Sequence, residues 1–179
     1  GLSQFCSPAG GACLSATLQS NNTIATGGAA GEALVNFLRG DRSNEDGGAT
    51  AYFRRRVHVL GDIVSSEARY VQAPLYSYRD VNYSQFKVDK AGRTGTVYVG
   101  SNDGMLHAFN ATSGQESWAY IPGFVLPNLY KLADKNYSTE HQYYVDNSPE
   151  TGDICPNTPT STCTAAEWKT ILVGGLNRG

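Results

Sequence analysis

The sequence predicts an all-β fold of antiparallel meanders, preceded by one short helix near the N-terminus. From Tyr52 onward, short runs rich in β-branched and aromatic residues alternate with turn residues. The chain has 179 residues, about the length of one domain. Its net charge is −2 and only 17% of its residues are charged, so we exclude nucleic acid as its main partner.

The helix is predicted from the spacing of apolar residues. Residues 1–31 are small and polar, with glycine and proline breakers, and should form loop. In Glu32–Gly40, the apolar residues Leu34, Phe37 and Leu38 have the i, i+3, i+4 spacing of a helix face, and Gly40 fits the helix end. A polar loop should follow, from 41 to 50.

Five short runs have the length and composition of strands. They are Val57–Ser65, Arg69–Tyr78, Thr96–Gly100, Met105–Asn110 and Glu116–Ile121. Hairpin turns are predicted at Ser101–Gly104, where Asp-Gly supplies the positive φ of a tight turn, and at Ala111–Gly114. The last three runs therefore form a meander.

A meander that ends in Trp118 resembles one blade of a β-propeller. One blade has two apolar faces and cannot bury both alone, so such units occur in rings. We therefore predict a partial β-propeller, with the first blades in residues 51–179 and a loop-rich segment with one helix in residues 1–50. Two rim insertions are expected, a short helix within Phe124–Ala133 and the loop between Cys155 and Cys163.

The sequence is also expected to be a fragment of a longer protein, because its last apolar run has only begun where it stops. No apolar run approaches the length of about 18 residues that a membrane-spanning helix needs.

The four cysteines form two local pairs, Cys6 with Cys13 and Cys155 with Cys163. Their spacing fits no common zinc motif, which favours two small disulfide loops over metal ligands or free thiols. Four cysteines allow three connectivities, although short-loop closure favours the local bonds. Disulfides would place the protein in the periplasm or outside the cell.

No catalytic template matches the sequence: it lacks a phosphate-binding loop, a nucleophile elbow, a zinc-protease motif and a calcium loop. His107 is expected to be a packed or edge histidine within a strand. His141 and Asp146 flank an expected strand, Tyr143–Val145, and a catalytic role for them is disfavoured. No catalytic, cofactor-binding or metal-binding residue is therefore assigned.

Three acids, Asp103, Asp146 and Asp153, are of the turn type and should accept hydrogen bonds from nearby backbone N–H groups. The integrin-binding tripeptide occurs at Arg39, Gly40 and Asp41, so one hypothesis is adhesion to animal cells. The same residues suit a helix C-terminus, which is the favoured interpretation.

Five segments, in consistent order, resemble the C-terminal propeller of the PilC/PilY family of type IV pilus tip adhesins and biogenesis factors. They are Leu34–Ser43, Leu60–Ser66, Val97–Asn110, Ala119–Pro122 and His141–Asp146. Among them, Gly61, Asp62, Asn102, Asp103 and Gly104 are turn and strand-end positions, which we expect to shape the fold. Residues 1–31 carry no motif that we can assign.

The resemblance implies a large secreted, non-enzymatic protein of the periplasm, outer surface or pilus tip. It would support pilus extension by opposing retraction, contact pilins or minor pilins, and adhere to a host-cell or surface receptor. Family members hold calcium in an Asp-rich loop that is absent here, so any calcium site would lie beyond Gly179.

Two other functions remain open. The repeat from Thr96 to Trp118 is also similar to that of quinone-dependent dehydrogenases, but those enzymes use two adjacent cysteines and this chain has none. The third possibility is an unrelated secreted propeller scaffold.

Overall fold

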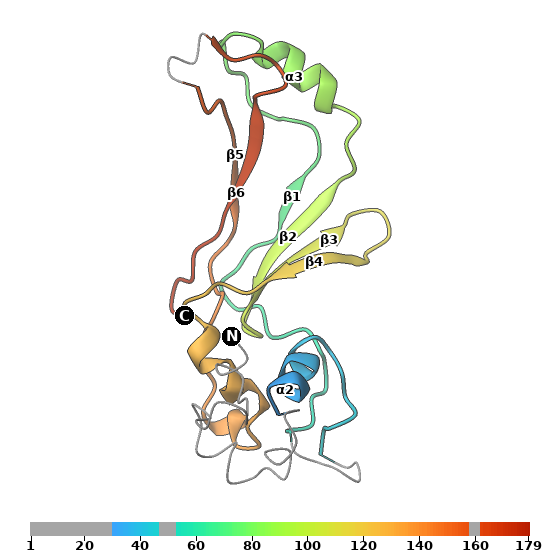
Figure 1. The fold of residues 1–179 in the computed structure, drawn as a ribbon, viewed down its shortest axis with the longest axis vertical. Coiled ribbons are helices and arrows are strands. Elements are labelled where there is room, and N and C mark those ends of the chain that lie inside the picture. Colours follow the sequence, from blue (N-terminus) through green and yellow to red (C-terminus); the bar gives the residue numbers. More distant parts are fainter. Residues whose placement is uncertain (1–29, 47–52, 158–161) are drawn as a thin grey trace.

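The computed structural model describes residues 30–46, 53–157 and 162–179. The described part is elongated, with α2 at one end, α3 at the other and the strands between them (Figure 1). In chain order the elements are α2 (Ala30–Leu38), β1 (Arg69–Val71), α3 (Tyr83–Lys90), β2 (Thr96–Ser101), β3 (Met105–Asn110), β4 (Glu116–Tyr120), the 3-10 helices η4 (Leu126–Ala133) and η5 (Tyr137–Thr139), β5 (Glu150–Ile154) and β6 (Lys169–Val173).

Helix α2 confirms the helix predicted near the N-terminus. Its predicted apolar face is buried and packs with residues of η4 and β3 in the main hydrophobic core. After the helix, Gly40 adopts a φ of 109° and its N–H donates to the carbonyl of Phe37. Arg56 adds a donor to the same carbonyl at 2.7 Å, so this carbonyl of the last turn has two donors.

The meander is confirmed as one antiparallel four-stranded sheet in the order β1-β2-β3-β4. Strand β3 has the predicted bounds, and β2 and β4 differ from theirs by one residue at one end. Both turns lie where they were predicted. In the second turn, the side chain of Asn110 accepts hydrogen bonds from the N–H groups of Thr112 and Ser113.

The two faces of this sheet have different neighbours. Tyr98, Ala108 and Trp118 are aligned across three strands on one face, and the rings of Tyr98 and Trp118 are 5.7 Å apart. An apolar cavity of about 750 Å³ separates this face from the end of β6. The opposite face, which carries His107, looks toward α2 across a second cavity of about 730 Å³. The sheet thus has the two apolar faces expected of a blade.

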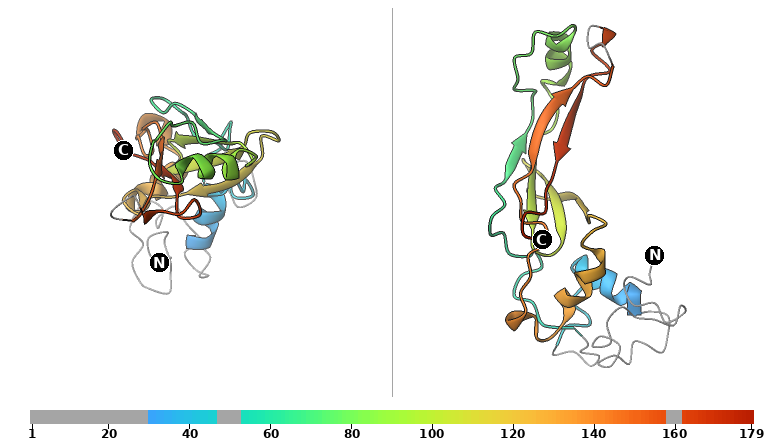
Figure 2. Two further views of the ribbon diagram at one scale, coloured as in Figure 1. Left: turned by 90° about the horizontal axis from the view of Figure 1, so that it is seen from above. Right: turned by 90° about the vertical axis from the view of Figure 1, so that its left-hand side faces the viewer.

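Strands β5 and β6 form a separate two-stranded sheet that runs beside β1 and β2 (Figure 2). At its far end lies a second core with α3. Cys155 and Cys163 are joined by a disulfide, as predicted, and pack there. Besides Ala165, the rest of this core is aromatic: Tyr76, Tyr83, Phe86 and Trp168. Helix α3 was not predicted from the sequence, and the Cys6–Cys13 pair lies outside the described residues.

Two strand predictions are wrong, and a third strand is shorter than predicted. Only Arg69–Val71 of the Arg69–Tyr78 run is a strand, and neither Val57–Ser65 nor Tyr143–Val145 forms one. In Val57–Ser65 the reason is visible in the backbone, because the N–H groups of Gly61 and Ser65 donate to aspartate side chains rather than to a neighbouring strand. The apolar residue Val57 is 83% exposed.

The helix predicted within Phe124–Ala133 exists as the 3-10 helix η4, and Pro127 lies in its first turn. In the part of the chain that the structure describes, no helix is long and apolar enough to cross a membrane.

Candidate functional site

Segments far apart in the sequence meet at the β2–β3 turn and form one hydrogen-bonded cluster, which we call the turn network. Its members are Gly61, Asp62, Asn102, Asp103, His107, Glu116, His141 and Tyr144. Four of the five residues expected to shape the fold belong to it, and the fifth, Gly104, lies in the turn itself. The structure therefore brings together residues that the sequence placed in three separate segments.

Asp103 is the centre of the network. Its Oδ2 accepts the backbone N–H of Gly61 at 2.9 Å, and its Oδ1 accepts that of Met105 at 3.2 Å. Both carboxylate oxygens lie 3.1 Å from Nε2 of His107. One carboxylate thus connects the 61–62 segment, the turn and β3.

Two glycines are required by the close packing of this turn. A Cβ on Gly61 would lie 2.4 Å from the backbone nitrogen of Asp103 and 2.7 Å from Oγ of Ser101. Gly104 has a φ of 91°, in the left-handed region, and a Cβ there would lie 2.3 Å from Cδ2 of Leu129. Gly61 is therefore required by the close approach of neighbouring atoms. Gly104 is required both by such an approach and by its left-handed backbone conformation.

Asn102 connects the turn to the segments that carry Asp62 and Tyr144, and it is 1% exposed. Its side-chain N–H donates to Oδ2 of Asp62 at 2.9 Å, and its Oδ1 accepts the N–H of Tyr144 at 3.0 Å. Burial opposes the charged form of Asp62, but hydrogen bonds from Asn102 and His141 outweigh it and lower the pKa of that carboxyl. Asp62 is therefore an acceptor held ionised, not a proton donor at neutral pH.

His107 is buried in β3 between two carboxylates. Its Nδ1 lies 2.6 Å from Oε1 of Glu116, and its Nε2 faces Asp103. Burial alone would lower the pKa of His107, but the two carboxylates outweigh it and raise that pKa. The sequence does not predict Glu116 as a partner of His107. A register irregularity between Ala108 and Phe109 is needed to bring the two side chains together.

The other predicted acids also hold the fold together. Buried Asp146 accepts the N–H of Ser65 at 3.0 Å and the side-chain N–H of Asn177 at 3.2 Å. Asp153 accepts hydroxyl hydrogen bonds from Tyr83 and Thr170, at 2.7 and 2.6 Å. The backbone N–H that Asp146 binds is therefore distant in sequence, and the partners of Asp153 are hydroxyl groups rather than N–H groups.

His141 is not paired with Asp146. Its Nε2 contacts Asp62 at 3.0 Å on the exposed edge of the turn network. Asp146 instead belongs to the buried contacts described above. The two residues therefore do not form a catalytic pair in this structure.

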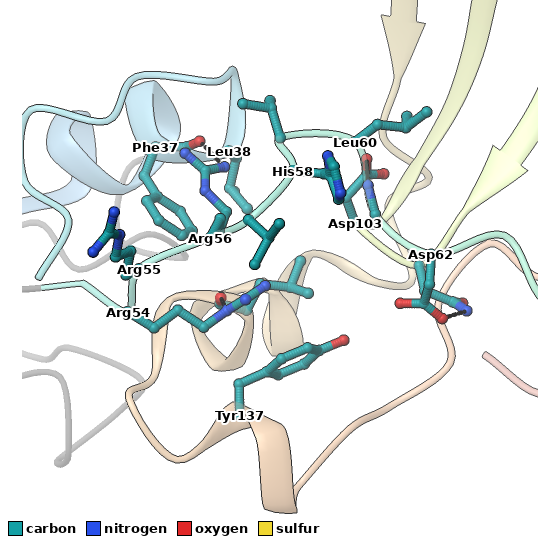
Figure 3. Close-up of a pocket in the computed structure, with 15 residues that line it drawn as sticks. Phe37, Leu38, Arg54, Arg55, Arg56, His58, Leu60, Asp62, Asp103 and Tyr137 are labelled. Atoms are coloured by element: carbon teal, nitrogen blue, oxygen red, sulfur yellow. Dashed lines mark hydrogen bonds between the residues drawn. The ribbon is translucent and has the colours of Figure 1, made fainter.

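A cavity of about 290 Å³ lies beside the turn network, between α2 and η5 (Figure 3). On one wall the guanidinium of Arg54 lies 4.4 Å from the ring centre of Tyr137. Burial raises the pKa of Tyr137 to about 12, so its phenol is protonated at neutral pH. On another wall, Arg56 is held by Glu45 at 2.7 Å and by backbone carbonyls. The cavity thus has no activated nucleophile among these residues.

Arg39, Gly40 and Asp41 lie at the end of α2. Oδ1 of Asp41 accepts the N–H of Ser43 at 2.8 Å, and the carbonyl of Asp41 accepts a hydrogen bond from Arg56. These contacts stabilise the helix end. Within residues 30–46, 53–157 and 162–179, no group of three or more histidine, cysteine or acidic side chains could hold a metal ion.

Comparisons with known proteins identify the family. The family model described as the PilY1 beta-propeller domain matches residues 60–179. The chain is 42% identical over 152 residues to a type IV pilus biogenesis factor PilY1 homolog of Xylella fastidiosa, covering 81% of this chain and 12% of that protein. It is 40% identical over 157 residues to type IV pilus biogenesis factor PilY1 of Pseudomonas aeruginosa strain PAK, covering 83% and 12%.

A solved structure, the Pseudomonas aeruginosa PilY1 C-terminal domain, is 31% identical and covers 60% of this chain and 20% of that one, with a TM-score of 0.37. The chain spans about an eighth of the length of the two curated relatives named above. The matched segment includes β1 to β6 and the whole turn network. From the family-model match and the identity to these relatives, we conclude that the chain belongs to the PilY1 β-propeller family.

Proposed function

We propose that this chain is the propeller portion of a type IV pilus biogenesis factor and acts there as a non-catalytic scaffold. The observation that carries the proposal is the identity of about two fifths to proteins named as such factors, over more than four fifths of the chain. The longer protein would support pilus extension by opposing retraction. It would contact pilins or minor pilins at the pilus tip.

The contacts of the turn network support a scaffold rather than an active site. Asp103 and Asn102 bind backbone N–H groups from other segments, and Asp62 is held by Asn102 and His141. A general base or a nucleophile needs a side chain that can reach a substrate, whereas these groups are engaged with the protein itself. A quinone-dependent dehydrogenase is the weaker alternative, because the sequence has no adjacent cysteine pair.

Adhesion and location belong to the same proposal. The disulfide between Cys155 and Cys163 suits an oxidising compartment, which supports a periplasmic, surface or secreted location. Adhesion to a host cell or surface receptor would involve the longer protein, with Arg39, Gly40 and Asp41 as a candidate on this chain. Calcium is implied only for the longer protein, and no residue of this chain is assigned to it.

The test is to delete the gene that encodes the longer protein and to count surface pili by electron microscopy. The count is made in cells with and without the retraction motor. We expect pili to be lost when the motor is present and restored when it is absent. Unchanged piliation in both backgrounds would rule out the role in opposing retraction.

A further inference from the structure

Both ring nitrogens of His107 face carboxylate oxygens. Nδ1 lies 2.6 Å from Glu116, and Nε2 lies 3.1 Å from each oxygen of Asp103. A neutral imidazole carries one N–H, so it can donate to only one of these acceptors, whereas the imidazolium donates to both. The geometry therefore requires the charged ring if both hydrogen bonds are to form.

The surroundings of His107 limit access of water to the ring. Its side chain is 7% exposed, and the ring of Phe109 stacks on it with 5.8 Å between centroids and an angle of 15°. The charged groups that line the adjoining cavity are Asp103 from the turn, Glu116 from β4 and Arg39 from α2. Two carboxylates oppose one guanidinium, so the local balance favours a positive ring.

Asp103 transmits the state of His107 to another segment. The carboxylate that contacts Nε2 also accepts the N–H of Gly61, 42 residues earlier in the sequence. Glu116 belongs to the edge strand β4, and its side chain is 46% exposed. The ring is thus in a position to couple the segment around Gly61 to β3 and β4.

We propose that Asp103, His107 and Glu116 form a proton-dependent latch that holds the segment around Gly61 against the four-stranded sheet. With the ring doubly protonated, both carboxylates are fixed and the latch is closed. When Nε2 releases its proton to solvent and Nδ1 keeps the shorter hydrogen bond to Glu116, Asp103 faces a nitrogen lone pair and is no longer held by the ring. The latch then loosens while the rest of the sheet stays paired.

The direction of the pH dependence follows from the raised pKa of His107. A raised pKa in the folded state means that the stabilisation is complete below the unfolded value, about 6.5. It is lost as the pH rises through the higher folded value. The latch is therefore closed under mildly acidic conditions and loosens under alkaline ones.

His141 provides a matched control. It also contacts an aspartate, Asp62, next to Gly61, but only through Nε2, and both side chains are substantially exposed. Replacing it removes a histidine–carboxylate contact at the same segment without touching the latch. His141→Gln is therefore the control for His107→Gln, and Glu116→Gln is a milder variant on an exposed residue.

Hydrogen exchange followed by mass spectrometry on the intact protein tests the latch. Exchange at the imidazole C2 positions gives the pKa of each histidine, and peptides covering 57–65 report the segment around Gly61. We expect the protection of these peptides, corrected for intrinsic exchange, to fall about tenfold between about pH 6 and about pH 9. His141→Gln should keep this fall, and His107→Gln should abolish it.

Glu116→Gln should move the pKa of His107 toward its ordinary value and shift the midpoint of the protection change with it. This variant keeps the experiment decisive if His107→Gln fails to fold. An ordinary pKa for His107 in the unmodified protein would overturn the latch. So would protection around Gly61 that does not change with pH.

Discussion

The carboxylate of Asp103 accepts the backbone N–H of Gly61 at 2.9 Å and so joins two segments that are 42 residues apart. The contact is possible because Gly61 has no side chain where the Asp103 backbone approaches. A hydrogen bond to an ionised acceptor is stronger than one between neutral groups. This relationship anchors the 61–62 segment on the sheet and underlies the first two predictions.

Gly61→Ala should destabilise the protein by about 2 kcal/mol, because the added Cβ would lie within 2.4 Å of a backbone atom that cannot easily move. Gly92→Ala is the matched control, since a Cβ at that position has open space around it. The free energy of unfolding of both variants is measured by urea denaturation. Equal stability of the two variants would show that the close approach at Gly61 is not required.

Asp103→Pro should disrupt the β2–β3 hairpin. Proline disfavours the turn conformation of the preceding residue and removes the carboxylate that holds Gly61, Met105 and His107. Asp103→Asn should have a smaller effect, because it keeps one acceptor oxygen. The secreted yield of the longer protein measures the difference. Normal secretion together with normal piliation in the proline variant would contradict the structural role of Asp103.

Replacing Cys155 and Cys163 together with alanine should destabilise the second core by about 2–3 kcal/mol, the loop-closure value for a sequence separation of 8. Trp168 packs in this core and Trp118 does not. Once Trp118 is replaced by phenylalanine, the fluorescence of Trp168 alone therefore reports the loss of stability in this core. Unfolding of this double-alanine variant is followed by Trp168 emission. Emission and midpoint unchanged from the disulfide-bonded protein would contradict the role of the bond.

Glu45→Gln should weaken the anchor of α2, since it removes one charge of a buried pair with Arg56. The expected loss is about 3–5 kcal/mol at neutral pH. Burial opposes ionisation of Glu45, but hydrogen bonds from Arg56 outweigh it and lower its pKa. The stabilisation is therefore present above the ordinary glutamate pKa and is lost as the pH falls through the lowered value.

Urea denaturation at about pH 7 and about pH 3 measures this effect. The stability difference between the unmodified protein and Glu45→Gln should shrink at the lower pH. Asp46→Asn is the control, because Asp46 forms an exposed ion pair with Lys135 at 3.7 Å. A difference that persists undiminished at the lower pH would contradict the ionised pair.

The local features of the fold could be predicted from the sequence. β3 and the two turns of the meander follow from residue alternation and turn residues, and α2 follows from the spacing of its apolar residues. The disulfide between Cys155 and Cys163 follows from short spacing. These features depend on residues that are close in the sequence.

What could not be predicted depends on distant partners. Val57–Ser65 has strand composition, but its N–H groups donate to Asp103 and Asp146 instead of to a strand. Helix α3 has a mostly polar sequence, and its two buried aromatic residues pack on Trp168, 80 or so residues later. The contact of His107 with Glu116 needs a strand irregularity that the sequence does not indicate.

The most direct test of the scaffold role introduces Gly61→Ala into the gene for the longer protein, with Gly92→Ala as the control. Surface pili are counted in cells with and without the retraction motor. We expect Gly61→Ala to reduce piliation only when the motor is present and Gly92→Ala to leave it normal. Normal piliation in motor-proficient Gly61→Ala cells, despite measured destabilisation of the protein, would contradict the scaffold role.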